Sequence, residues 1–259
     1  MTAPTTPDVW RPGWTRRVLL TVGLVLPLAG ATIALELAPP PAPVALLSGD
    51  APVMAALPGA TRDDAAPGTA AVYHVDVLWA ERIAARTGIP VRAVLAYGAA
   101  DLAVDAEQPG CGLGWNTLAA IGSIESGHGS HGGAVLGDDG RSVPEIRGVP
   151  LDGDGVAAIP DTDDGTWDGD VVWDRAVGPM QFIPTTWARW GADADGDGIS
   201  DPDVLDDAAL AAARYLCADA TMTTSEGWRA AVLTYNRSDE YADSVARIAT
   251  EYARRAGAP

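Results

Sequence analysis

From residue 75 to the C-terminus the sequence shows one helical pattern after another, interrupted by a single long stretch without helical period. We expect helices where apolar residues recur three and four positions apart, between start and stop signals such as Pro90 and Gly88. The expected helices cover 75–86, a segment opened by Pro90, 115–126, a segment starting near 185, and segments around 210–217, 228–235 and 238–252. This spacing predicts a mainly α fold.

The interruption runs from 127 to about 178 and is rich in Gly and Asp. A loop of this length in a compact domain is usually functional or mobile. Much of the net charge of -18 is concentrated nearby, because residues 138–207 hold 18 Asp and Glu against four Arg. Such a surface repels other polyanions, so we expect no nucleic-acid partner.

The N-terminal part predicts a membrane or export signal. Arg16 and Arg17 precede an uncharged apolar run from Val18 to Leu35, which places the N-terminus in the cytoplasm and the rest outside. We favour an uncleaved single-pass anchor in the cell membrane. A cleaved signal, with secretion to the cell wall, is the alternative. The predicted organisation is a cytoplasmic end at 1–17, the anchor or signal at 18–37, a Pro/Ala-rich linker at 38–70 and one domain at 71–259.

Cys111 and Cys217 are the two cysteines, and both lie in the part predicted to be exported. An oxidising compartment lets such cysteines pair, so we expect one disulfide between them. Two unpaired buried thiols are the alternative.

Glu125 is the lone carboxylate at the end of the otherwise apolar helix expected over 115–126. Leu118, Ile121 and Gly122 share its face at helical spacing, and we expect that face to be buried. Apolar neighbours raise the pKa of a carboxyl group and suit it to donate a proton near neutral pH. The alternative is a surface Glu whose head group reaches water.

Residues 193–199 match the first half of a calcium loop, with carboxylates at alternate positions, a glycine for the sharp turn and a backbone carbonyl next. The twelfth position, which usually carries Glu, is Val204 here. We expect a structural Ca²⁺, and the alternative is a solvated acidic loop. The candidate ligands are Asp193, Asp195, Asp197 and the carbonyl of Ile199, with a closing carboxylate from Asp201, Asp203, Asp206 or Asp207.

Two further motifs are ambiguous when each is taken alone. Gln181 is the hydrogen-bonding side chain of the turn Gly178–Pro184 and is either a sugar contact or a solvated turn residue. Asn236 follows Tyr235 at a helix end and is either a cap or a ligand contact. In order and spacing, however, the Glu-Ser pair, the Gly-Pro-Met-Gln-Phe turn, the calcium loop and Thr-Tyr-Asn together resemble the lytic murein transglycosylases, specifically the membrane-bound B type. The resemblance covers about residues 75–255.

The resemblance implies a lysozyme-like, mostly helical fold in which Glu125 is the sole catalytic acid and base. It implies that the calcium loop closes on Asp207 and that the substrate is the glycan strand of peptidoglycan. The β-1,4 bond between MurNAc and GlcNAc would be cleaved with formation of 1,6-anhydro-MurNAc ends, for cell-wall remodelling by a monomer. The implied substrate contacts are Ser126, Gln181, Tyr235 and Asn236. The chain departs from the family in its long acidic insertion at 138–174.

Two other functions stay open at this point. A muramidase would deliver water with the help of a loop aspartate, and a calcium-stabilised wall-binding module would have lost activity. A zinc site at His128 and His131 is disfavoured because no helix fixes these histidines. Trp167 and Trp173, in the acidic insertion, are candidates for stacking on sugar rings.

Overall fold

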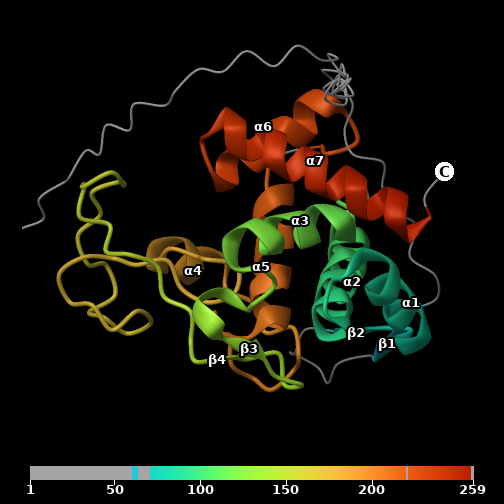
Figure 1. Cartoon of the computed structure of the whole chain (residues 1–259), viewed down its shortest axis with the longest axis horizontal. Helices are drawn as coiled ribbons and strands as arrows, with labels where there is room; N and C mark the ends of the chain where they lie inside the picture. Colours follow the sequence, from blue (N-terminus) through green and yellow to red (C-terminus); the bar gives the residue numbers. More distant parts are fainter. Residues whose placement is uncertain (1–59, 64–70, 220, 258–259) are drawn as a thin grey trace, which may run out of the picture. The chain divides into compact units, whose positions relative to one another are not determined.

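The computed structural model describes residues 60–63, 71–219 and 221–257, and the mainly α fold is confirmed there. The seven α-helices of this part are shown in Figure 1. They are α1 (Val77–Thr87), α2 (Val91–Glu107), α3 (Trp115–Ser126), α4 (Pro184–Trp190), α5 (Leu205–Cys217), α6 (Ser225–Tyr235) and α7 (Asp239–Ala256). Two antiparallel strand pairs accompany them: β1 (Ala60–Asp63) with β2 (Val72–Val75), and β3 (Val135–Leu136) with β4 (Ser142–Val143).

The helix ends follow local signals in the sequence. The Asp76 side chain accepts a hydrogen bond from the Trp79 N–H and starts α1, and the Ser238 hydroxyl does the same for Tyr241 at the start of α7. Gly88 and Gly127 end α1 and α3 in the left-handed conformation that glycine adopts without strain. Capping of this kind explains why these helices are predictable from the sequence.

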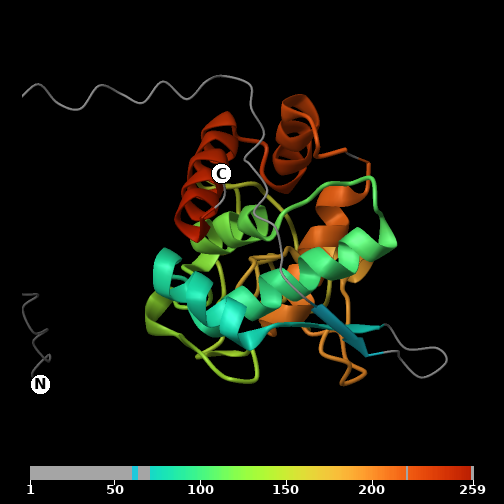
Figure 2. The same cartoon turned by 90° about the vertical axis from the view of Figure 1, so that its right-hand side faces the viewer.

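The core forms around α3, which packs against α2, α5 and α7. Figure 2 shows α7, in red, lying along α3. Trp115, Leu118 and Ile121 of α3 are completely buried. The α2–α5 interface includes many small side chains, which let the two helices approach closely.

The aperiodic stretch after α3 holds one 3-10 turn (His131–Gly133) and the β3–β4 pair, in which Val135 lies opposite Val143. Its loops extend away from the helices beside α4 (Figure 1). Aspartate side chains organise these loops by accepting a hydrogen bond from the backbone N–H two residues later, which replaces helical pairing. The aspartates that do so are Asp139, Asp152, Asp161, Asp168 and Asp170.

The predicted linker at 38–70 needs a correction. β1 lies inside it and pairs with β2, with Ala60 opposite Val75, so the folded part begins before the predicted boundary at residue 71. Strand pairing uses backbone groups, and a four-residue strand with no apolar alternation gives little sequence signal. The predicted cytoplasmic end at 1–17, the anchor at 18–37 and the rest of the linker lie outside the described residues. In the described ranges, no helix has the length and apolar character needed to cross a bilayer.

The predicted disulfide is confirmed: Cys111 and Cys217 are bridged, with their Cα atoms 5.6 Å apart. The bridge joins the turn before α3 to the last residue of α5. It therefore ties the segment that leads into the Glu125 helix to the end of α5.

Candidate active site

Glu125 occupies the last turn of α3, partly buried and still reachable by solvent. The Tyr241 hydroxyl donates a hydrogen bond to its Oε1 at 2.6 Å. Burial raises the pKa of Glu125 to about 7, against the opposing effect of this hydrogen bond, which stabilises the carboxylate. The predicted rise in pKa is therefore confirmed, and the group can both donate and accept a proton near neutral pH.

The face of α3 beneath Glu125 is buried, as the spacing predicts. One turn before the carboxylate, Gly122 leaves room for the Tyr97 hydroxyl of α2, since a Cβ at that position would lie 2.0 Å from that oxygen. Any larger residue would displace the buried Tyr97 side chain from this position. The glycine thus lets the Tyr97 hydroxyl lie against the turn that carries the acid.

Ser126 does not face the open side of the site, which corrects the prediction that it contacts substrate. Its side chain is 1% exposed, and its hydroxyl donates to the carbonyl of Pro179 at 2.6 Å and accepts from the Gly129 N–H at 2.7 Å. A short hydroxyl next to buried backbone groups satisfies them at low cost. Ser126 therefore ties the end of α3 to the turn that carries Gln181.

That turn is a narrow loop closed by backbone hydrogen bonds in both directions between Val177 and Phe182. Gly178 has a φ of 73°, and a Cβ there would lie 1.8 Å from the carbonyl oxygen of Pro202. Gln181 also has a positive φ, 51°, which is uncommon for a residue other than glycine. Its side-chain amide donates to the Gly178 carbonyl at 2.9 Å, and the side chain is partly exposed.

Tyr235 and Asn236 lie at the C-terminal end of α6. The Tyr235 hydroxyl donates to the carbonyl of Met180 at 2.8 Å, and its ring meets Phe182 edge to face. The structure thus joins α6 to the Gln181 turn and, through Ser126, to Glu125. Asn236 caps α6 through its backbone N–H and has an exposed residue surface. The predicted glycan contacts of Gln181, Tyr235 and Asn236 stay predictions.

Aromatic side chains continue from this turn into the acidic insertion. Phe182 contacts Trp187 of α4, and Trp187 contacts Trp167 of the insertion, with ring centroids 5.4 and 6.4 Å apart. Trp187 is buried, whereas Trp167 and Trp173 are partly exposed. Trp167 therefore packs against the core through Trp187 and retains an accessible surface.

The carboxylates of the predicted calcium loop divide into two groups. Asp193, Asp195 and Asp197 each offer one oxygen, and these three atoms lie within 4.8 Å of one another. Asp207 is 1% exposed beneath the loop, and its two oxygens accept the N–H groups of Ala194 and Asp201. Burial, the largest cause, and the nearby aspartates raise the pKa of Asp207 to about 7.

Ile199, whose carbonyl is the predicted backbone ligand, is 58% exposed and donates its N–H to Asp197. Of the alternatives for closing the loop, Asp201, Asp203 and Asp206 are paired with the guanidinium groups of Arg141, Arg147 and Arg92, respectively. Asp207 is held instead by the backbone N–H groups of Ala194 and Asp201, and its predicted role in closing the loop stays a prediction.

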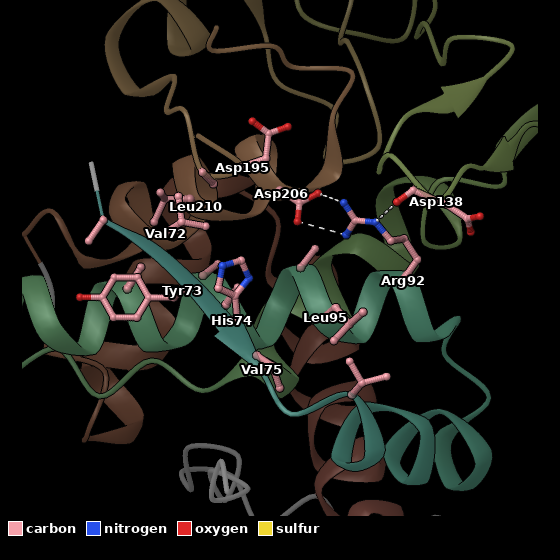
Figure 3. A pocket seen from close by; sticks show the side chains of 17 residues that line it. Val72, Tyr73, His74, Val75, Arg92, Leu95, Asp138, Asp195, Asp206 and Leu210 are labelled. Atoms are coloured by element: carbon pink, nitrogen blue, oxygen red, sulfur yellow. Dashed lines mark hydrogen bonds and ion pairs between the residues drawn. The ribbon is translucent and has the colours of Figure 1, made fainter. Parts of the chain in front are cut away.

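A cavity of about 390 Å³ lies elsewhere in the domain, between β2, α2 and α5 (Figure 3). Its walls are mostly apolar, and Arg92 spans one end by pairing with Asp206 and donating to the carbonyl of Asp138. Asp195 of the predicted calcium loop also lines it, whereas Glu125 and Gln181 do not. This cavity is thus separate from the candidate acid.

Tyr241 is a site residue that the sequence does not reveal, because its spacing marks it as part of the apolar face of α7.

Tyr241→Phe should lower kcat roughly 10- to 100-fold, the effect of losing a hydrogen bond to a charged group. The pKa of Glu125 should rise, because the bond that stabilises its carboxylate is gone. The decline of activity at high pH should therefore move to higher pH in a pH–rate profile.

Tyr215→Phe is the matched control for this change. It removes a tyrosine hydroxyl that donates to the Thr234 carbonyl and does not contact Glu125. An unchanged pH–rate profile in Tyr241→Phe would contradict the assigned role.

A family model and a solved structure are similar to parts of this chain. The family model described as "Transglycosylase SLT domain" matches residues 160–233, a range that includes Gln181 and the predicted calcium loop, while Glu125 and Tyr235 lie outside it. No curated protein sequence matches. The solved structure of SltB3 from Pseudomonas aeruginosa in complex with NAG-anhNAM-pentapeptide is similar at 17% identity with a TM-score of 0.38, and the match covers 67% of this chain and 66% of that one. Residues 160–233 are therefore similar to the transglycosylase SLT domain, the family to which the order of the motifs points.

Proposed function

We propose that the protein is a peptidoglycan lytic transglycosylase that cleaves the β-1,4 bond between MurNAc and GlcNAc and leaves 1,6-anhydro-MurNAc ends. The observation that carries this proposal is Glu125, whose partly buried carboxyl group has a pKa raised to about 7 and a fixed partner in Tyr241. The SLT-domain match supports the same activity. A remodelling role in the cell wall follows from the substrate.

One carboxyl group suffices for this reaction. Glu125 would give its proton to the glycosidic oxygen as the bond from that oxygen to the anomeric carbon breaks. The 6-hydroxyl of the MurNAc residue then bonds to the anomeric carbon of the same residue and gives its proton to the Glu125 carboxylate. Because the attacking oxygen belongs to the sugar itself, its effective concentration is high and no activated water is needed. Ordinary glycosidases use a second carboxylate for that task.

The residues around Glu125 would bind the glycan on its open side. Gln181 and Asn236 carry amide groups that can both donate to and accept from sugar hydroxyls. Both are at least partly exposed, which supports this role. Trp167 would supply an apolar ring face for a sugar further along the strand.

The products of peptidoglycan digestion test the proposal directly. Incubation of purified peptidoglycan with the protein should release muropeptides with anhydro ends, detected by mass spectrometry. Reducing ends would instead indicate a muramidase. Binding without cleavage would indicate a wall-binding module, for which an acid with a raised pKa has no use.

We further propose that the acidic loop holds a structural Ca²⁺, bound by Asp193, Asp195, Asp197, the carbonyl of Ile199 and Asp207. The donor set fits this ion, because calcium prefers carboxylate and carbonyl oxygens and three of the carboxylate oxygens already converge. The bound ion would neutralise crowded negative charge between α4 and α5. It takes no part in the chemistry at Glu125.

Calcium should raise the melting temperature of the metal-free protein by roughly 5–10 °C at a hundredfold excess over the dissociation constant. Asp195→Asn should remove most of this rise in calorimetry, because one ligand charge is lost. Asp154→Asn is the matched control, since it changes an exposed acid in a similar Asp-Gly-Asp-Gly run of the insertion. An equal calcium response in both variants would contradict the site.

The localisation is also a proposal. We infer that the segment at 18–37 anchors the chain in the cell membrane, or is cleaved, with the catalytic domain outside as a monomer on glycan strands. The disulfide between Cys111 and Cys217 supports an oxidising compartment. Cell fractionation with and without protease treatment of intact cells tests this placement.

A further inference from the structure

A buried histidine follows the candidate acid closely in the sequence. His128 follows the end of α3, three residues after Glu125, and is 7% exposed. Its Nδ1 lies 3.2 Å from the hydroxyl of Tyr97 on α2, and its Nε2 lies 3.0 Å from the hydroxyl of Tyr252 on α7. The imidazole thus links α2 to α7 at the point where α3 ends.

The backbone at His128 is unusual. Its φ is 61°, in the left-handed region that residues other than glycine rarely adopt, and it lies between Gly127 at 59° and Gly129 at 83°. Such conformations persist where surrounding contacts hold them, and they cluster at active sites. Here the His128 N–H also bonds the carbonyl of Gly122 at 2.9 Å, which ties the turn back to α3.

Both tyrosine partners of His128 belong to contacts that also set the position of Glu125. The Tyr97 hydroxyl fills the space left by Gly122, one turn before the acid on the same face. Tyr252 lies eleven residues after Tyr241 on α7, so the two tyrosines share a helix face. Tyr241 bonds Glu125 and Tyr252 bonds His128, so α7 holds the end of α3 at two points.

We propose that His128 is a positioning residue for the acid: its imidazole bridges Tyr97 and Tyr252 and keeps the Glu125 carboxyl within hydrogen-bond distance of Tyr241. This inference rests on the proposed function of Glu125. It assigns the histidine no contact with substrate. A neutral ring suits this role, because it offers one donor and one acceptor to the two hydroxyls.

The neutral ring is maintained by its surroundings. Burial lowers the pKa of His128 to about 4, so the ring keeps one protonation state across the pH range in which Glu125 titrates. The titratable groups that face the pair are Tyr97 from α2, Tyr235 from α6, and Tyr241 and Tyr252 from α7. Burial raises the pKa of Tyr97, Tyr235 and Tyr241, which keeps these three uncharged as well.

The test compares His128→Phe, which fills the site without hydrogen bonds, with His128→Gln, which retains a donor and an acceptor. Misplacement of a catalytic group by about 1 Å can cost about a hundredfold in rate, so His128→Phe should lower kcat by roughly 10- to 100-fold with KM nearly unchanged. The decline of activity at high pH should also shift upward, because Glu125 loses the stabilising bond from Tyr241. His128→Gln should restore most of both properties. His131→Phe is the control, since His131 is exposed and lies outside the network.

The pKa of Glu125, measured by NMR of its labelled carboxyl carbon, gives a readout that does not depend on activity. It should rise in His128→Phe even if the wild-type protein proves to be a wall-binding module, so failure of the proposed function and failure of this inference are distinguishable. A variant that melts at lower temperature yet retains the wild-type kcat and Glu125 pKa would overturn the proposal. If His128→Phe does not fold, Tyr252→Phe removes one of the two bonds and should shift the same pKa in the same direction, and no shift would overturn the proposal.

Discussion

Replacing Glu125 with Gln should abolish the release of anhydro muropeptides, with a loss of at least about a thousandfold in kcat. A positioned acid or base contributes roughly 10²- to 10⁴-fold, and here one carboxyl group serves in both roles, so both contributions are lost together. The amide has nearly the same shape, and its oxygen can still accept the hydrogen bond from Tyr241. Mass spectrometry of the digest measures the loss, and circular dichroism checks that the fold is retained.

Glu125→Gln should abolish activity but raise the stability of the fold near pH 8, and this second effect is a control for the raised pKa of Glu125. The pKa of Glu125 rises from 4.5 to about 7 on folding, so between these pH values the folded chain holds a proton that the unfolded chain has lost. The stability of the wild-type protein therefore falls with pH across this window, by at most about 3 kcal/mol from this group. The glutamine of Glu125→Gln does not ionise, so the stability of the variant does not decrease with pH for this reason. Its melting temperature should exceed that of the wild type near pH 8 and match it near pH 4.

Asp101 and Asp207 also have pKa values raised by burial, to about 8 and about 7, and destabilise the fold in the same direction as pH rises. Both aspartates are present in the wild type and in Glu125→Gln, so their effects cancel when the two melting temperatures are compared. A constant difference in melting temperature from pH 4 to pH 8 would show that Glu125 is ionised normally, and would remove the basis for its role as the acid.

The sequence predicts the helices well because their signals are local. The apolar run of α3 and its terminal Gly127 lie within a few residues of each other, and the predicted 115–126 matches the observed helix. Glu125 stands out for the same reason, as one carboxylate in an apolar segment. β1 escaped prediction because its pairing with β2 depends on backbone groups that every sequence provides.

The partners of the acid could not be predicted in this way. Tyr241 bonds Glu125 across 116 residues of sequence, and this contact depends on how α7 packs on α3. Ser126 illustrates the reverse case. A hydroxyl beside a catalytic acid resembles a substrate contact, yet the fold brings the Pro179 carbonyl within 2.6 Å of it and uses the hydroxyl to hold the Gln181 turn.

Removing the disulfide should cause the largest loss of stability and leave the chemistry largely intact. Cys111 and Cys217 are 106 residues apart, and a crosslink that closes a loop of about 100 residues restricts the unfolded chain by about 4.7 kcal/mol in the chain-entropy model. At about 2–4 °C per kcal/mol for a domain of this size, the melting temperature should fall by roughly 10–20 °C. Calorimetry of a variant with both cysteines changed to Ala measures this without leaving a reactive thiol.

The kcat of that variant at 25 °C should stay within about threefold of the wild type, because other contacts hold the start of α3 in place. Asp101 accepts the Trp115 N–H at 2.8 Å, and the Cys111 carbonyl accepts the Met222 N–H at 2.6 Å, neither of which needs the sulfur atoms. The position of Glu125 at the other end of α3 depends on Tyr241 and the buried face below it. A large fall in kcat well below the melting temperature would mean that the bridge also positions the acid, whereas an unchanged melting temperature would mean that the unfolded chain is already restricted without it.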